Sequence, residues 1–403
     1  MAKVTINGQV VKVKSGTSIL NAANSIGIEI PTLCFIKEIN EIGFCRICVV
    51  EVEGEQDLVS ACNTEIKNGM VINTDSDKVI QSRESTLQLL ASKHRFDCWR
   101  CPKDGMCEFY DILKFHNIVF EEFGPGVGRN PEQIFGTAVS QDQSKCILCK
   151  RCVAVCQNVA AANVLKFRDD DGMNPVVSPT VGLSFDQGGC TFCGQCVKSC
   201  PTGTLFETDH IKEVEALIKD ENKTVVVQMD PAVRVSLAEE FGYEIGSLVE
   251  ETEGKIYEAL NLLGFDEITN TTWAEDLVIL EQSNELADKL NNGEELPLFT
   301  SSCPAWIRYA EMFNPEYLDN ISKTKSPHMI QGSLIKNHYG PKYLNKKPLD
   351  IAVVSVMPCT AKKYEISRPE LEVDGVRDVD AVLTIRELAK MIKRKGIKFN
   401  KLN

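Results

Sequence analysis

Hydrophobic residues near the start of the chain alternate with polar ones, as they do in β-strands. Residues 4–6 and 10–13 show this alternation, and the intervening Asn7-Gly8 favours a two-residue hairpin turn. Thr17 or Ser18 can cap a helix that continues toward Gly27. Strand-like runs follow at residues 49–52 and 71–73. The pattern predicts a small domain of the β-grasp type.

The pattern changes after this region. Residues 78–92 show a helical period, and beyond about residue 220 strand and helix signals alternate. We expect strands at residues 224–228, 296–300, 349–356 and 379–383, and helices at 231–241, 255–263, 274–290 and 385–393. Such alternation predicts an α/β domain with a mainly parallel sheet. Ligands of such domains gather beyond the carboxyl ends of the strands, where we expect Cys303 and Cys359.

Composition narrows the class of protein. A chain of 403 residues with 43% hydrophobic content is ordinary for a globular protein of two to four domains. Neither a secretory signal nor an apolar run of about 20 residues is visible, so we expect a cytoplasmic protein with reduced thiols. The net charge of −13 argues against nucleic-acid binding, which needs a basic surface.

Fifteen of the 17 cysteines, together with one histidine, fall into four spaced groups. The last two groups both repeat the bacterial ferredoxin run Cys-x2-Cys-x2-Cys-x3-Cys, in which the fourth cysteine binds the other cluster. The spacing therefore predicts two [4Fe–4S] clusters, one on Cys146, Cys149, Cys152 and Cys200, the other on Cys156, Cys190, Cys193 and Cys196. Zinc is the alternative, but it needs four thiolates rather than eight in two matched runs.

The first two groups are less specific. Four thiolates at Cys34, Cys45, Cys48 and Cys62 suit a [2Fe–2S] cluster, although the first gap of ten residues is longer than in the plant-type pattern. The second group joins His94 to Cys98, Cys101 and Cys107, and one histidine with three cysteines is also a zinc pattern. Structural zinc stays open for both groups on spacing alone.

The order of these groups resembles the N-terminal half of clostridial-type [FeFe]-hydrogenases. The likeness includes Cys-Arg-Ile-Cys at 45–48, Cys-Glu-Phe at 107–109 and Gly-Lys-Ile-Tyr at 254–257. The resemblance implies iron as the metal at all four groups, with His94, Cys98, Cys101 and Cys107 holding a third [4Fe–4S] cluster. The segments around Cys303 and Cys359 resemble the first two signatures that hold the hydrogen-activating cofactor of this family.

The resemblance has departures within the hydrogenase-like part. Ser302 stands where active members have a proton-passing cysteine, and Gln282 stands where they have a glutamate. Asp230 replaces a small residue against the di-iron unit, where a carboxylate would be repelled or forced into protonation. Lys362, which resembles the cyanide-contacting lysine, is retained, as are Glu285, Ser322 and Glu365. The third family segment, with two more cysteines, is absent from the chain that ends at Asn403.

We therefore expect an α+β multidomain chain in four parts. These are a β-grasp [2Fe–2S] ferredoxin-like domain (1–78), a [4Fe–4S] domain with one histidine and three cysteines (79–125), a bacterial-ferredoxin-like domain with two [4Fe–4S] clusters (126–218) and a truncated [FeFe]-hydrogenase-like α/β domain (219–403). We then interpret Cys303 and Cys359 as two buried structural thiols. The alternative is that they bind a cofactor whose other ligands come from another subunit or from further sequence. The loop-like stretch 124–128, with three glycines, is only a weak nucleotide-binding signal.

Three functions follow from this interpretation. The first is a non-catalytic electron-relay subunit of a multi-subunit, electron-bifurcating NAD(P)H/ferredoxin oxidoreductase, without a complete hydrogen-activating cluster. The family's multi-subunit relatives imply a flavin- and NAD-binding subunit, a small [2Fe–2S] subunit and ferredoxin as its partners. The second is a fragment of a ferredoxin-dependent [FeFe]-hydrogenase. The third is an iron–sulfur sensor or assembly factor.

Overall fold

The computed structural model describes residues 1–119, 133–169, 176–179, 183–247 and 249–402 of the chain. These residues form two compact units. The N-terminal unit contains residues 1–136, 140–190 and 195–206, and the C-terminal unit contains residues 137–139, 191–194 and 207–403. The stretch 124–128 and the predicted domain boundary at 125/126 lie outside the described residues.

The N-terminal unit begins with the predicted hairpin. Strands β1 (Ala2–Ile6) and β2 (Gln9–Val13) pair antiparallel, and Asn7 and Gly8 between them have φ angles of 46° and 78°. Both residues thus adopt the left-handed conformation that this turn requires. The sheet order is β2-β1-β5-β3-β4, with β3 at Val49–Val52, β4 at Val59–Ser60 and β5 at Val71–Asn73. Helix α1 (Ile19–Asn24) is capped by the Ser18 hydroxyl, as predicted, and packs on this sheet.

The rest of the N-terminal unit consists of short elements around the later cysteine groups. Helix α2 (Asp77–Ala91) confirms the predicted helix, and α3 (Glu108–Phe115), α4 (Arg151–Asn158) and α5 (Gln195–Ser199) follow. Strands β6 (Gln133–Ile134), β7 (Val139–Asp142) and β10 (Leu205–Glu207) form one sheet, and β8 (Lys166–Arg168) pairs with β9 (Val176–Ser178). These strands are too short to produce a period in the sequence.

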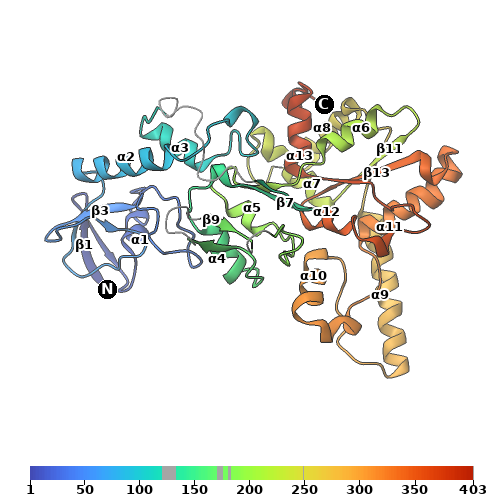
Figure 1. Ribbon diagram of the computed structural model, residues 1–403, viewed down its shortest axis with the longest axis horizontal. Helices are drawn as coiled ribbons and strands as arrows, with labels where there is room; N and C mark the ends of the chain where they lie inside the picture. Colours follow the sequence, from blue (N-terminus) through green and yellow to red (C-terminus); the bar gives the residue numbers. More distant parts are fainter. Residues whose placement is uncertain (120–132, 170–175, 180–182, 248, 403) are drawn as a thin grey trace. The chain divides into compact units, whose positions relative to one another are not determined.

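The C-terminal unit is built on a four-stranded parallel sheet of order β12-β11-β13-β14 (Figure 1). Its strands are β11 (Thr224–Met229), β12 (Glu267–Asn270), β13 (Ile351–Met357) and β14 (Ala381–Thr384). Val225 and Val227 face one hydrophobic core, whereas Val226 faces another, so the sheet is buried on both sides. This explains the continuous hydrophobic run of β11 and confirms the predicted parallel sheet.

Helices cover both faces of this sheet. Residues of α6 (Ile211–Lys219), α7 (Pro231–Ser236), α8 (Val249–Leu263) and α13 (Ile385–Arg394) pack in the first core, and those of α11 (Pro327–Leu334) in the second. Helix α9 (Thr272–Asn292) extends beyond the sheet (Figure 1), and α10 (Pro304–Phe313) and α12 (Ala361–Glu365) complete the unit. No described helix is long and apolar enough to cross a membrane.

The predicted strand at residues 296–300 is wrong. Only an isolated bridge forms there, in which Phe299 N–H donates to Asn320 O (2.7 Å) and Ser322 N–H donates to Phe299 O (2.8 Å). Pro297 has no N–H to offer to a sheet. The sheet edge is instead β12, whose half-buried residues gave no clear strand pattern. Consequently Cys359 follows a strand of the sheet, as predicted, but Cys303 does not.

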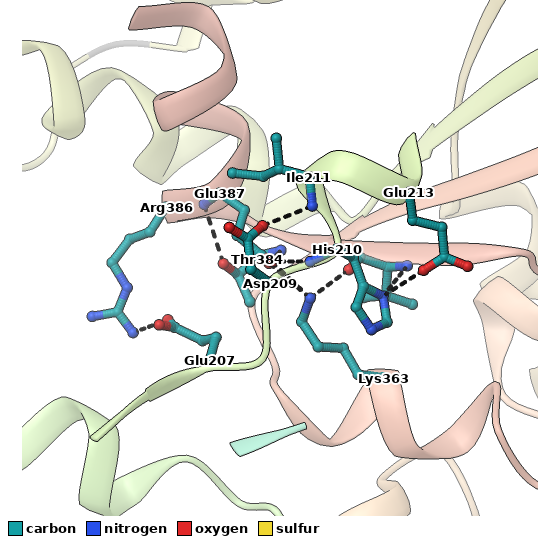
Figure 2. A network of polar contacts seen from close by, with 10 residues as sticks. Glu207, Asp209, His210, Ile211, Glu213, Lys363, Thr384, Arg386 and Glu387 are labelled. Atoms are coloured by element: carbon teal, nitrogen blue, oxygen red, sulfur yellow. Dashed lines mark hydrogen bonds and ion pairs between the residues drawn. The ribbon is translucent and has the colours of Figure 1, made fainter. Parts of the chain in front are cut away.

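A buried polar network holds the first residues of the C-terminal unit to β14 and α13 (Figure 2). The Glu387 carboxylate accepts hydrogen bonds from Thr384 N (2.6 Å), His210 N (2.9 Å) and Lys363 Nζ (2.9 Å). Arg386 pairs with Glu207 beside it. Burial lowers the pKa of Lys363, and its ion pair with Glu387 opposes that effect. The network therefore ties residues 207–213 to the parallel sheet.

Candidate functional sites

The first cysteine group is buried between α1, the loop before β3 and α2. Its four thiols form two hydrogen-bonded pairs, Cys34 with Cys45 and Cys48 with Cys62. The hydrogen bond from Cys34 lowers the pKa of Cys45 to about 6, and the one from Cys62 lowers the pKa of Cys48. The same interactions, with burial, raise the pKa of Cys34 and of Cys62. Four buried thiols that interact with one another fit the donor set of a [2Fe–2S] cluster.

In the second group, α2 ends just before His94 and thereby places the imidazole in a buried position. The ring packs against Phe96 and Phe109, with centroids 4.8 and 5.3 Å away, and its Nδ1 atom has no hydrogen-bond partner. Burial, followed by the charge of Lys145, lowers the pKa of His94 to about 4. A neutral, buried imidazole with an unpaired nitrogen fits the role of a metal ligand.

The three cysteines of this group influence one another. Burial raises the pKa of Cys98, and it raises that of Cys107 to about 11; the charge of Cys101 raises both further. Cys107 occupies the N-cap of α3, where its sulfur accepts from Tyr110 N (3.5 Å). The thiols thus lie close enough together for electrostatic coupling, which fits ligands of one cluster.

The third group lines a single small cavity. Cys146, Cys149, Cys152 and Cys200 all contribute to its wall, although Cys200 lies in the other ferredoxin run. Burial raises the pKa of Cys149 and of Cys152, so both thiols are costly to ionise without a bound cation. The four cysteines of the predicted ligand set thus surround one common point, as the ligands of a single [4Fe–4S] cluster must.

The fourth group is spread over several elements. Cys156 lies on α4 and Cys196 on α5, which pack against each other, whereas Cys190 and Cys193 lie in the loop before α5. The sulfur of Cys156 accepts a hydrogen bond from Val164 N (3.3 Å). The ligand set of this group remains a prediction from the spacing.

Contacts between the second and third groups are direct. The Cys107 thiol donates to Pro201 O (3.6 Å), and Pro201 follows Cys200. Arg151 lies beside Cys152 in the sequence. Its Nη1 atom donates to both carboxylate oxygens of Glu108, at 2.9 Å (Oε1) and 2.8 Å (Oε2). These contacts join the loops of two predicted cubes.

The hydrogenase-like segments place their two cysteines in different environments. Cys303 is exposed at the N-cap of α10, and Cys359 is partly buried between β13 and α12. Burial raises the pKa of Cys359, and the charge of Cys303 raises it further, so the two thiols lie near each other. The expectation of two buried structural thiols is wrong for Cys303, because its segment does not join the sheet.

The Lys362 ammonium uses two of its three hydrogens on protein groups. It donates to Ser302 O (2.9 Å) and to Glu365 Oε2 (2.8 Å), and His328 Nε2 lies 2.8 Å from the same carboxylate. Burial raises the pKa of Glu365, but the charge of Lys362 and the hydrogen bond with His328 outweigh it and hold the pKa at about 2. Burial lowers the pKa of His328. The carboxylate therefore forms a buried ion pair with Lys362 and a hydrogen bond with His328.

Two further positions that resemble the family's proton relay differ in their bonding. The Ser322 hydroxyl donates to Glu285 Oε2 (2.5 Å), so this retained pair is in contact. The Nε2 atom of Gln282 is buried without a hydrogen-bond partner. An amide cannot take up and release a proton at neutral pH, so Gln282 interrupts a relay through this position.

Asp230 has a structural role that the sequence interpretation did not include. Its Oδ1 atom accepts from Ala232 N (2.8 Å) and thereby caps helix α7. The expectation that this carboxylate would be repelled or protonated considered only a cofactor beside it.

The sequence interpretation also missed Asn40 and Arg83, whose buried side chains donate to backbone carbonyls. A single polar residue in a loop or helix gives no sequence pattern that predicts such hydrogen bonds.

Together, the four cysteine groups and their contacts fit an iron–sulfur electron-transfer protein. Models of a 2Fe-2S iron-sulfur cluster binding domain, a 4Fe-4S dicluster domain and the C-terminal domain of the iron only hydrogenase large subunit match residues 1–77, 145–204 and 223–403. The chain belongs to the iron-only hydrogenase large-subunit family. The predicted family is thus confirmed.

Three relatives illustrate the range of this similarity. The NADP-reducing hydrogenase subunit HndD of Solidesulfovibrio fructosivorans is 39% identical over 99% of this chain and 69% of its own length. Iron hydrogenase 1 of Clostridium pasteurianum is 40% identical over 100% of this chain and 69% of its own length. The NADPH-Fe(3+) oxidoreductase subunit alpha of Geobacter sulfurreducens is 34% identical over 51% of this chain and 24% of its own length.

Proposed function

We propose that this chain is the iron–sulfur electron-relay subunit of a multi-subunit, electron-bifurcating NAD(P)H/ferredoxin oxidoreductase and has no working hydrogen-activating cluster. It would carry one [2Fe–2S] and three [4Fe–4S] clusters on the four groups described above. Its partners would be a flavin- and NAD-binding subunit, a small [2Fe–2S] subunit and ferredoxin, in the cytoplasm. The names of two relatives, an NADP-reducing hydrogenase subunit and an NADPH-Fe(3+) oxidoreductase subunit, support NAD(P) chemistry in such a complex.

One observation carries the electron-relay part of this proposal. The loops of the first three cysteine groups contact one another through hydrogen bonds, including Phe109 N to Pro201 O (3.4 Å), an ion pair and a shared hydrophobic core that contains Cys34, Cys45 and Cys149. Clusters held on such loops would lie close together, as single-electron transfer requires. The third group contacts both the first and the second, so its cube would receive or supply electrons along two branches.

The proposal of an inactive hydrogen site is supported by the C-terminal unit. Ser302 is a much weaker acid than the cysteine that the family has at this position, and Gln282, in place of the family's glutamate, cannot take up and release protons. Lys362, the expected cyanide contact, is already engaged by Ser302 O and Glu365. Each feature reduces the ability of this unit to bind the di-iron group or to supply it with protons.

The decisive experiment begins with anaerobic purification of the chain with its co-purifying subunits. We expect about 14 irons per chain, as one binuclear and three cubane clusters contain, and reduction of these clusters by NADH or NADPH in the complex. We also expect no hydrogen evolution after exposure to the hydrogenase maturation system. Zinc in place of iron would contradict the cluster assignment, and reduction that does not follow NAD(P)H or ferredoxin would favour a sensor or assembly role.

Two cysteine variants sharpen this test. Cys149→Ser should remove the cube of the third group and interrupt electron flow through the complex, because both branches meet there. Cys303→Ser is the matched control and should leave electron flow nearly unchanged. An equal loss in both variants would mean that Cys303 also carries a redox group.

A second candidate function is hydrogen activation, which the intact Ser322–Glu285 contact favours. Under this alternative the chain would be part of a ferredoxin-dependent [FeFe]-hydrogenase. Hydrogen evolution by the matured protein, lost in Cys303→Ser and Cys359→Ser variants, would establish this alternative and refute an inactive site.

A further inference from the structure

Asn40 joins the loops of two predicted clusters through a single side chain. Its amide Nδ2 donates to Cys34 O (2.5 Å) and to Cys149 O (3.3 Å). Cys34 belongs to the first cysteine group and Cys149 to the third, 115 positions later in the sequence. An asparagine amide has two hydrogens, and both are used here, one on each ligand residue.

The position of this amide is tightly fixed. Asn40 is only 3% exposed, and its backbone pairs in both directions with Ile36, at 2.8 and 3.0 Å. The two carbonyl oxygens also determine the orientation of the amide, because only its nitrogen end can donate to them. A buried side chain with two satisfied donors is held rigidly in place.

A second contact holds the same two loops together independently of Asn40. The Lys150 ammonium, next to Cys149, lies 3.8 Å from the ring centroid of Phe167 and 3.9 Å from that of Phe44. Phe44 precedes Cys45, so this cation–π contact again joins the first group to the third. Cys34, Cys45 and Cys149 also share one hydrophobic core. The spacing of the loops therefore does not depend on Asn40 alone.

We propose that the side-chain amide of Asn40 electronically couples the [2Fe–2S] cluster to the [4Fe–4S] cluster of the third group. The inference rests on the proposed function, because it requires clusters on Cys34 and Cys149. The electron would pass from the Cys34 side chain to the Cys34 carbonyl, then through the two N–H groups of the Asn40 amide, and finally to the carbonyl and side chain of Cys149. One cluster is oxidised and the other reduced by the same electron, and no heavy-atom bond forms or breaks.

The physical reason is that electronic coupling decays more slowly through bonds than across a gap. Between these loops the Asn40 amide supplies two hydrogen bonds to ligand residues. The cation–π contact of Lys150 joins side chains that are not ligands, so it fixes distance without supplying a comparable route. Removal of the amide should thus reduce the transfer rate while the clusters stay where they are.

The test compares Asn40→Leu with wild type in the full chain, purified anaerobically with its clusters. Leucine has a similar size but donates no hydrogen bond. Asn158→Ala is the matched control, because Asn158 Nδ2 donates to Ile39 O (3.3 Å) and so contacts the same loop without touching a cysteine. If Asn40→Leu does not fold, Asn40→Ser serves instead, since its one hydrogen cannot reach both carbonyls at once.

Three measurements are made on each protein: the potentials of both clusters by EPR-monitored titration, their dipolar coupling by pulsed EPR, and the rate of electron exchange after a reducing pulse followed by freeze-quench EPR. We expect the exchange rate of Asn40→Leu to fall several-fold at an unchanged driving force. The dipolar coupling should stay at its wild-type value, and Asn158→Ala should match wild type throughout.

The other outcomes overturn the inference. An unchanged rate would show that the amide is not on the route. A lower rate together with a changed dipolar coupling would show that Asn40 acts by setting the distance between the clusters. A lower rate explained by shifted cluster potentials would show that Asn40 acts through the driving force. Wild-type protein without iron at these two groups would refute the proposed function, and the inference with it.

Discussion

Arg83 is a buried cation beside the first cysteine group. Its guanidinium donates to the carbonyls of Ile47, Val49 and Thr74, at 2.9, 3.0 and 3.3 Å. Burial lowers the pKa of Arg83, and the charge of Cys48 opposes that effect. A positive charge so close to a thiolate should stabilise the added electron of a reduced [2Fe–2S] cluster.

We predict that Arg83→Gln lowers the reduction potential of the [2Fe–2S] cluster and destabilises the N-terminal unit by roughly 1–3 kcal/mol, because buried carbonyls lose their donors. EPR-monitored titration and chemical unfolding measure the two effects. Arg83→Lys keeps the positive charge but loses the planar guanidinium that reaches three carbonyls. We therefore expect this variant to keep a nearly wild-type reduction potential but to lose part of its free energy of unfolding. Equal potentials in both variants would exclude the charge as the cause.

His210 makes the stability of the C-terminal unit depend on pH. Its Nδ1 accepts from Val382 N (3.5 Å), and Lys363, Asp209, Glu213 and Glu387 lie around it in the network of Figure 2. Burial, and then the charge of Lys363, lowers the pKa of His210 from 6.5 to about 4. The unfolded chain thus binds a proton at a pH where the folded chain does not.

The folded state therefore loses stability as the pH falls from 6.5 toward 4, by at most about 3 kcal/mol from this residue. We predict that hydrogen exchange of the Val382 amide accelerates between pH 7 and pH 5 in wild type more than in His210→Gln, after correction for the intrinsic pH dependence of exchange. A parallel change in both proteins would mean that another group titrates.

At the scale of elements, the Asp230 side chain stabilises the start of helix α7. We predict that Asp230→Ala destabilises this helix by about 1 kcal/mol, whereas Asp230→Asn changes little, since asparagine caps helices as well as aspartate does. Hydrogen exchange over residues 231–236 measures the effect. Similar losses in the alanine and asparagine variants would indicate that the negative charge, rather than the cap, is required.

Elements with a strong local signal were predictable from the sequence. The Asn7-Gly8 hairpin, the capped helix α1 and the doubly buried strand β11 each follow from residues that are neighbours in the chain. The prediction of a strand at 296–300 was wrong because the backbone there pairs with Asn320 and Ser322, which no local sequence pattern reveals. Its hydrophobic residues predicted burial but not the partner.

At the scale of the whole molecule, the grouping of cysteines was predictable because ligand spacing is a property of the sequence. The contacts between the groups were not predictable, because Asn40, Arg151 and Pro201 act across long sequence separations. The same limit explains the exposure of Cys303, which depends on where its segment pairs. Spacing thus predicts which residues share a site, and the fold determines which sites are neighbours.

Removal of iron should affect the two units unequally. The described cysteines of the first three groups all lie in the N-terminal unit, whereas the C-terminal unit has cores on both faces of its own sheet. Because clusters bound only by the folded state stabilise it, we predict that chelation increases hydrogen exchange in the N-terminal unit far more than in residues 207–402 of the C-terminal unit. Equal increases in both would imply that they unfold together.

Gly203 illustrates how closely two of these loops approach each other. A Cβ atom at this position would overlap the sulfur of Cys101 and also lie against Pro102. For any residue other than glycine, either the Cys101 side chain or one of the two loops would have to shift. The missing side chain thus lets two predicted cluster-binding loops approach each other closely, so even an alanine there should displace a predicted ligand.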